Sequence, residues 1–99
     1  MFCPDIPPHV SEAFGHFSPD LKRSIKAAVR ALCVNPNDGD PLVKELEGLW
    51  KYRVRRFRIV YAIDQRRKVI RVMAIGHRRE VYEEVTEHFP RRRKGKFSK

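Results

Sequence analysis

Three consecutive stretches of strand-forming sequence between residues 49 and 75 limit the possible folds more than any other feature of the chain. In the first stretch, Leu49–Arg55, apolar residues alternate with basic ones: Trp50, Tyr52 and Val54 against Lys51, Arg53 and Arg55. This period of two predicts a strand with one apolar and one basic face. Two more strands are predicted over Arg58–Ile63 and Val69–Ile75, with a hairpin loop at Asp64–Lys68 between them and Gly76 as the end of the last. Short links between successive strands predict an antiparallel meander.

Two amphipathic helices are predicted before these strands. Apolar residues recur at helical spacing from Val10 to Phe17 and again from Leu21 to Leu32. Ser18, Pro19 and Asp20 have the composition of a helix N-terminus, so the second helix begins there. The turn-forming sequence Asn35–Gly39 ends it. The two helices together form a helical hairpin.

The remaining segments carry weaker patterns. Phe2–Pro8 contains three prolines and is expected to be irregular rather than a strand, and Pro41–Leu46 is expected to form a turn of helix. Arg79–Phe89 has its apolar residues on one helical face and ends at Pro90. With 99 residues the chain suffices for one domain. We expect an α+β domain over residues 1–89, a helical hairpin packed on a curved antiparallel β-sheet with a short C-terminal helix, and a basic, disordered tail over residues 90–99.

The positive charge of the chain is concentrated on the predicted sheet. The net charge is +10, and residues 50–79 hold eleven Lys and Arg against the single acid Asp64. Such an excess favours a polyanionic partner, which means nucleic acid or an anionic surface. Neither a membrane span nor a signal peptide is expected, so we expect a soluble cytoplasmic protein. Cys3 and Cys33 form no Cys-x-x-Cys pair and the histidines lack ligand spacing, so we expect neither a disulfide framework nor a metal site.

Four arginines and one tyrosine are predicted to gather at one surface. Arg53 and Arg55 emerge from the basic face of the first strand, and Arg58 begins the adjacent strand. Arg78 follows the last strand, and Tyr82 comes one helical turn later. Arginine forks grip phosphate oxygens in pairs and a tyrosine ring can stack on a base, so this set could hold a scissile phosphate. The same pattern fits a sheet that binds RNA or DNA without cleaving it, and charge and alternation alone favour that passive role.

At this point the order of several short motifs resembles RelE-type toxins. A Leu-x-Gly motif at Leu46–Gly48 precedes the first strand, which carries Tyr52-Arg53-Val54-Arg55, and the second strand begins Arg58-Ile59-Val60-Tyr61. The third strand is followed by Gly76-His77-Arg78 and then by Val81-Tyr82. Each motif is weak alone, but their order and spacing match the family over about residues 10–83, which is most of the chain.

The resemblance implies a toxin of a type II toxin–antitoxin system. Such a toxin is a metal-independent endoribonuclease without a cofactor, which cleaves mRNA in the ribosomal A site by attack of a 2′-hydroxyl on the adjacent phosphate. By position, Arg53 and Arg55 would bind RNA and help to activate the 2′-hydroxyl, and Arg58 would stabilise the scissile phosphate. Arg78 would protonate the leaving oxygen or steady its charge, and Tyr82 would orient or stack on the substrate. Further RNA contacts are expected from Lys51, Arg56, Arg71, His77 and Arg79.

Two features depart from the family pattern. The family usually opens with an edge strand, which Phe2–Pro8 fits poorly, so that strand could be short, absent or replaced by a partner. The family also often carries lysine where this chain has Arg53 and Arg55. Arginine is a poor proton acceptor at neutral pH, so electrostatic stabilisation suits these two residues better than acid–base catalysis. Tyr82 and His77 are then the candidate bases.

The resemblance also implies partners. A cognate antitoxin would neutralise the toxin, and the ribosome with its A-site mRNA would be the target; contact with DNA is expected only for the toxin–antitoxin complex. The acidic segment Glu80–Glu87 covers little of the basic surface, so an acidic or amphipathic segment of the antitoxin is expected to dock there. Two other functions stay open. One is inhibition of DNA gyrase by a ParE-like protein, a group that shares the fold and generally lacks this set of basic residues and tyrosine. The other is a regulator that binds nucleic acid on the same sheet without cleavage.

Overall fold

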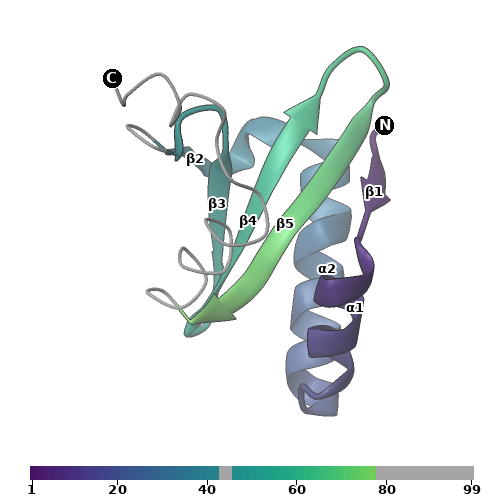
Figure 1. Cartoon of the computed structure of the whole chain (residues 1–99), viewed down its shortest axis with the longest axis vertical. Coiled ribbons are helices and arrows are strands. Elements are labelled where there is room, and N and C mark those ends of the chain that lie inside the picture. The colour runs from purple at the N-terminus through teal and green to yellow at the C-terminus, as the bar shows by residue number, and fades with distance from the viewer. Residues whose placement is uncertain (43–45, 78–99) are drawn as a thin grey trace.

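A computed structural model describes residues 1–42 and 46–77, which form two α-helices and a five-stranded sheet (Figure 1). The strands are β1 (Cys3–Asp5), β2 (Asp40–Pro41), β3 (Trp50–Val54), β4 (Phe57–Asp64) and β5 (Val69–His77), in the order β1-β5-β4-β3-β2. The predicted antiparallel meander is confirmed as β3-β4-β5. Because β1 pairs with β5 in parallel, the sheet is mixed rather than antiparallel throughout.

The edge strand β1 lies where irregular structure was expected, so that expectation is wrong for Cys3–Asp5. The strand is three residues long and exposed throughout. The Cys3 N–H donates to the Lys68 carbonyl at 2.9 Å, beside β5. Successive N–H groups of a strand point to opposite sides, so the missing N–H of Pro4 would face away from β5, where proline is tolerated. A short edge strand can therefore form despite the prolines around it.

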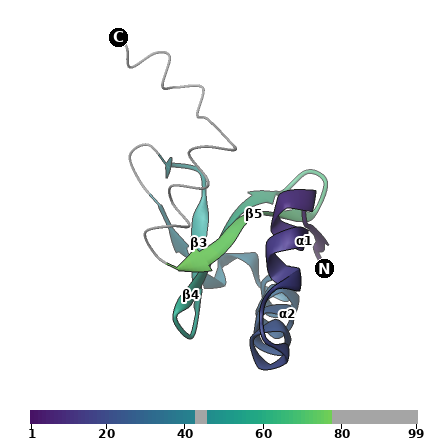
Figure 2. The same cartoon turned by 60° about the horizontal axis from the view of Figure 1, so that its bottom comes forward.

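The helices α1 (Pro8–Gly15) and α2 (Pro19–Val34) confirm the predicted helical hairpin. α1 begins two residues before the predicted start at Val10. The Ser18 hydroxyl accepts a hydrogen bond from the Leu21 N–H at 3.2 Å, which is the expected cap of α2. A short 3-10 helix, η1 (Pro36–Asp38), follows α2. Figure 2 shows both helices together beside the β3–β5 meander, which twists along its length.

Each face of the sheet carries its own apolar cluster. On the helix side the core joins residues of α1 and α2 to Val54, Ile59, Tyr61, Ile70, Val72 and Ile75 of the sheet. On the other side Leu49, Val60, Met73 and Ala74 are buried, with Leu42, Leu46 and Ala62 packed against them. A register shift lies between Val60, which pairs with Ala74, and Tyr61, which pairs with Val72. Met73 is the extra residue of this bulge, which is why the adjacent residues Met73 and Ala74 both belong to the cluster on the side away from the helices.

Tyr61 links the sheet to the segment after α2. Its side chain is fully buried, and its hydroxyl donates to the Pro36 carbonyl at 2.8 Å. Burial raises the pKa of this phenol to about 12. A Cβ added at Gly39 would overlap both the Tyr61 hydroxyl and the Lys51 carbonyl oxygen, so this position requires glycine.

Residues 40 and 41 form an edge strand instead of the predicted turn of helix. Asp40 pairs with Lys51 and Pro41 with Trp50, so the prediction for Pro41–Leu46 is wrong at its first residue. The reason is local, since a residue before proline is held in the extended region and favours continuation of the sheet. Residues 43–45 lie outside the described part.

The C-terminal helix predicted over Arg79–Phe89 and the tail predicted over residues 90–99 lie outside the described residues. Within residues 1–42 and 46–77, neither helix has the length and the apolar content needed to cross a membrane.

Candidate nucleic-acid interface

Arg53 and Arg58 occupy directly opposite positions on β3 and β4. They flank the hairpin that closes with Val54 opposite Phe57, so only two residues separate the strands. The residues next to them, Tyr52 and Ile59, pack into the core on the helix side. Side chains alternate between faces along a strand, so both arginines project from the face opposite the helices. Residues paired in this way have Cβ atoms about 4.5–5.5 Å apart, which brings two guanidinium groups within reach of one phosphate.

Gly76 lies opposite Arg58 on the third strand of this face. The sequence suggested that Gly76 ends the strand, but β5 continues through it to His77. A glycine contributes no side chain to the face, so β5 places no Cβ beside Arg58. Sequence reasoning missed this neighbour because the strand was predicted to stop at Ile75, although a glycine within a strand is itself a sign of close approach by another group.

Arg55 and Arg56 form the two-residue turn between β3 and β4, and both are exposed. The prediction that β3 includes Arg55 is wrong by one residue, since the strand ends at Val54. Arg55 has a φ of 55°, in the left-handed region that favours glycine. A non-glycine residue held there costs roughly 1–2 kcal/mol. The chain thus carries a strained arginine next to the Arg53–Arg58 pair.

Lys51 lies on the same face, one row further from the turn. It pairs with Val60, which in turn pairs with Ala74, and both of these partners are buried in the smaller apolar cluster. Lys51 itself is half-buried. The face is therefore basic only near the turn and apolar behind it, in contrast to the wholly basic face that alternation predicted.

Arg71 lies apart from these cations. It pairs with Ala62 near the opposite end of β5, five residues from Gly76, or roughly 16 Å at the rise of a strand. Its guanidinium bonds the carboxylate of Asp5 on β1 at 3.1 Å. Arg71 therefore forms an ion pair with the neighbouring strand β1. The sequence does not predict this pair, because it does not predict β1.

His77 also lies away from the arginine pair. It pairs with Phe57, and the centroids of the two rings are 4.3 Å apart. Phe57 packs in turn against Phe17 beside α1, with ring centroids 5.2 Å apart. His77 therefore belongs to the helix side of the sheet, whereas Arg53 and Arg58 belong to the other.

The structure brings together five of the ten residues named from the sequence: Lys51, Arg53, Arg55, Arg56 and Arg58. Arg78, Arg79 and Tyr82 lie outside the described residues. No group of three or more His, Cys, Asp or Glu that could hold a metal occurs among the described residues. Chemically, the five basic residues offer four guanidinium forks and one ammonium group to a phosphate backbone.

Comparisons with known proteins found one matching family and several similar structures. A family model described as the ParE toxin of the type II toxin–antitoxin system parDE matches residues 5–82. None of the curated proteins compared gives a significant match. Among solved structures, a mutant of the E. coli toxin RelE in the free state superposes with a TM-score of 0.74 at 17% identity, covering 89% of this chain and 97% of that one.

Two antitoxin-bound toxins superpose almost as well. The RelBE2 toxin–antitoxin complex of Mycobacterium tuberculosis gives a TM-score of 0.70 at 20% identity, covering 77% of this chain and 96% of that one. The heterotetrameric YoeB–YefM complex of Staphylococcus aureus gives 0.66 at 16% identity, covering 78% and 97%. These solved structures show that the chain shares their fold. The family model in addition matches most of its sequence. The chain belongs to the ParE toxin family of type II toxin–antitoxin systems, within the RelE/ParE superfamily.

Proposed function

We propose that this toxin is a metal-independent endoribonuclease that cleaves mRNA in the ribosomal A site. The observation that carries the proposal is the opposed pair Arg53 and Arg58 on the face away from the helices, with Arg55 and Arg56 at the adjoining turn. Four guanidinium groups at the end of one hairpin favour a phosphate chain over a protein surface as the ligand. The motifs that resemble RelE-type toxins point to the same chemistry.

The proposed reaction is an in-line displacement at phosphorus. The 2′-oxygen of one nucleotide forms a bond to the adjacent phosphorus while the bond from phosphorus to the 5′-oxygen of the next nucleotide breaks. The proton of the 2′-hydroxyl passes to a base, and the 5′-oxygen receives a proton as it leaves. The products are a 2′,3′-cyclic phosphate and a free 5′-hydroxyl, so neither a metal nor a cofactor is needed.

Each basic residue has a proposed part in this step. Arg58 and Arg53 stabilise the charge that develops on the equatorial phosphate oxygens, because fixed cations favour the transition state most where charge accumulates. Arg55, Arg56 and Lys51 hold the flanking phosphates. Arg78 neutralises the leaving oxygen.

Tyr82 is the proposed base or stacking residue. The location of His77 on the helix side gives it a supporting role at the sheet end rather than a role in proton transfer. The ribosome would hold the mRNA in line, since orientation can contribute several kcal/mol to a barrier.

Inhibition of DNA gyrase is the second candidate, because the matching family model is that of ParE toxins. In that case the arginine pair would serve as a docking surface, and RNA would not be cleaved. The two candidates predict opposite results with the same purified protein.

The test is cleavage of a defined mRNA with and without programmed ribosomes, run beside a gyrase supercoiling assay. We expect ribosome-dependent cuts, reduced about 10²–10³-fold in Arg58→Ala and in Arg78→Ala, the range for loss of one charge-stabilising group. Arg66→Ala, which removes an exposed arginine from the β4–β5 loop, is the matched control and should cleave normally. Absence of cuts together with inhibited supercoiling would establish the second candidate instead.

A further inference from the structure

Gly76 completes the row that Arg53 and Arg58 begin, and it carries no side chain. Arg53 on β3 lies opposite Arg58 on β4, and Arg58 lies opposite Gly76 on β5. Neighbouring strands are about 4.7–4.9 Å apart, so the row crosses all three strands within about 10 Å. Two guanidinium groups and a bare stretch of backbone therefore lie side by side at one end of the sheet.

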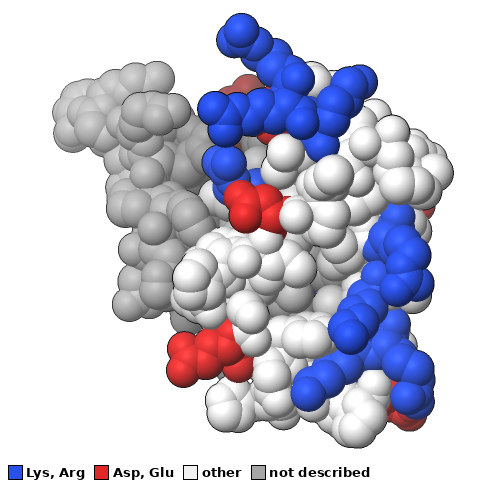
Figure 3. Space-filling model, turned by 90° about the vertical axis from the view of Figure 1, so that its right-hand side faces the viewer, with Lys and Arg blue, Asp and Glu red and all other residues white. Residues whose placement is uncertain are grey.

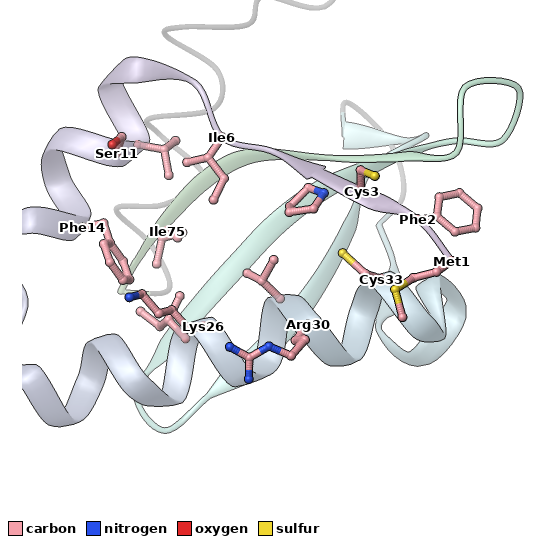
Figure 4. Close-up of a pocket in the computed structure, with 14 residues that line it drawn as sticks. Met1, Phe2, Cys3, Ile6, Ser11, Phe14, Lys26, Arg30, Cys33 and Ile75 are labelled. Carbon is pink, nitrogen blue, oxygen red and sulfur yellow. The ribbon is translucent and has the colours of Figure 1, made fainter.

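A side chain at position 76 would lie on the same face as the two arginines. The adjacent Ile75 is buried in the core on the helix side, and Figure 4 shows it at the groove that it lines together with Phe14. Successive residues of a strand point to opposite faces, so position 76 belongs to the face away from the helices. A Cβ there would project next to Arg58 on the neighbouring strand.

The backbone at this position does not require a glycine. Gly76 lies within β5, which continues to His77, and Gly48 is the glycine with a positive φ in the described part of the chain. A residue with a side chain could therefore adopt the conformation of Gly76. Glycine weakens a strand because it loses more conformational freedom on folding than any other residue. Its presence inside β5 points to close approach by another group.

We propose that Gly76 is a positioning residue for cleavage: the RNA backbone crosses β5 at this glycine, which lets the scissile phosphate lie close to Arg58 and Arg53. The inference rests on the proposed cleavage of RNA. A ribose adjoins every phosphate, so a phosphate held by the arginine pair brings a ribose over a neighbouring strand. A side chain at position 76 would lift this ribose from the sheet and move the phosphate away from the guanidinium groups, whose hydrogen bonds depend on short distances.

The surroundings of Gly76 favour an effect on position over an effect on affinity. β1 pairs with β5 from Val69 to Arg71, so within residues 1–42 and 46–77 no strand borders Gly76 on its outer side. Figure 3 shows the side of the molecule that carries β1 and α1, where Lys and Arg gather at the top and along one margin with a mostly uncharged area between them. RNA that passes Gly76 toward this side gains few phosphate contacts, so its affinity depends mainly on the arginines of the hairpin.

The test is a series of side-chain sizes at position 76, measured with the full chain and mRNA on programmed ribosomes. At saturating toxin, we expect single-turnover rates reduced about tenfold in Gly76→Ala and about 100-fold in Gly76→Val, because a displacement of about 1 Å can cause such a loss. The toxin concentration that gives half the maximal rate should change by less than about threefold, since no cation is lost.

The matched control is Ala62→Val, which adds a similar bulk to the same face of the sheet. Ala62 packs against the apolar cluster on that face and pairs with Arg71. It lies four residues from Arg58 along β4, or about 13 Å at the rise of a strand. This variant should cleave within about threefold of wild type, because it leaves the row of the arginine pair unchanged.

Three further measurements separate positioning from a structural role. Valine is a better strand former than glycine, so Gly76→Val should melt at the temperature of wild type or above it. In the Arg58→Ala background Gly76→Val should slow cleavage little further, because the contact that it disturbs is already absent. The salt dependence of binding to a labelled oligonucleotide should keep its slope in Gly76→Val and become shallower in Arg58→Ala, which loses a cation.

Each outcome decides between this inference and an alternative. With a wild type that cleaves, a Gly76→Val rate within about threefold of it would overturn the inference, as would losses that multiply fully in the double variant. A melting temperature of Gly76→Ala below that of wild type would assign the glycine to packing within the toxin itself. A wild-type chain that cuts no mRNA would overturn the proposed function and this inference with it, so the wild type alone tells the two failures apart.

Discussion

Arg53 on β3 and Arg58 on β4 face each other across one hairpin, on the side of the sheet opposite α1 and α2. Like charges at directly opposite positions of an antiparallel pair destabilise it. The adjacent Arg55 adds a second cost through its left-handed backbone. Two unfavourable features at one end of a hairpin are consistent with a site whose residues serve binding at the expense of stability.

Replacing one member of the pair should make the toxin more stable and a weaker RNA binder. Arg53→Thr removes the repulsion and introduces a good strand former, so we expect a gain of about 0.2–1 kcal/mol in the free energy of unfolding. Urea denaturation measures the gain, and fluorescence anisotropy with a labelled oligonucleotide measures the lost affinity. Arg66→Thr, in a loop without an opposed cation in the strand register, is the control and should gain nothing. Equal stability of Arg53→Thr and wild type would show that the pair is not repulsive in solution.

The turn residues Arg55 and Arg56 offer a comparison within one turn. Arg55→Gly relieves a φ of 55°, so we expect stabilisation of up to about 1 kcal/mol. Arg56→Gly removes the same charge at a position without a positive φ, so it should destabilise by about 0.5–1 kcal/mol through backbone entropy alone. Both variants lose one cation and should show a similar loss of RNA affinity and a shallower salt dependence. Thermal unfolding decides the first point; if both glycines destabilise equally, Arg55 is unstrained.

The sequence predicts the parts of this fold that local pattern determines. The Ser18–Pro19 start of α2 and the alternation through Trp50 and Val54 each depend on residues close in the chain, and both are confirmed. β1 was not predicted because three residues around Pro4 carry no pattern of their own and become a strand only beside β5, more than sixty residues later.

The site was predicted in part for the same reason. Arg53 and Arg58 belong to one hairpin, so their spacing in the sequence indicates that they meet. The side of the sheet on which His77 and Gly76 lie depends on how far β5 continues. The sequence leaves this open, because a glycine can mark either the end of a strand or a point within it that another group approaches closely. The bond from Arg71 to Asp5 depends on β1, and no local signal announces it.

His77 should be dispensable for proton transfer. Its ring lies 4.3 Å from that of Phe57 on the helix side, so His77→Ala should cleave mRNA within about threefold of wild type, whereas loss of a general base costs about 10²–10⁴-fold. The same variant should lose about 0.5–1.5 kcal/mol of stability, the range for one aromatic pair. Single-turnover cleavage beside Tyr82→Phe makes the comparison. A 10²-fold loss in His77→Ala with Tyr82→Phe unaffected would reverse the two assignments.

Tyr61 should make the stability of the toxin fall at high pH. Burial raises the pKa of its phenol to about 12 from the ordinary value of 10.0, so the folded chain holds this proton more tightly than the unfolded chain does. The stability it contributes is complete below pH 10 and is lost as the pH rises through about 12, on the order of 2 kcal/mol in all. Urea unfolding at a series of pH values should show this decline in wild type.

Tyr61→Phe should lack this decline in stability at high pH. It leaves the Pro36 carbonyl without its donor and should cost about 1 kcal/mol near neutral pH. Between pH 10 and 12 it lacks the ionisation that weakens wild type, so the difference between the two proteins should shrink, vanish and then change sign, because wild type loses more than the substitution costs. If the two proteins differ by a constant free energy of unfolding across this range, Tyr61 keeps an ordinary pKa, and its hydrogen bond to the Pro36 carbonyl does not make stability depend on pH.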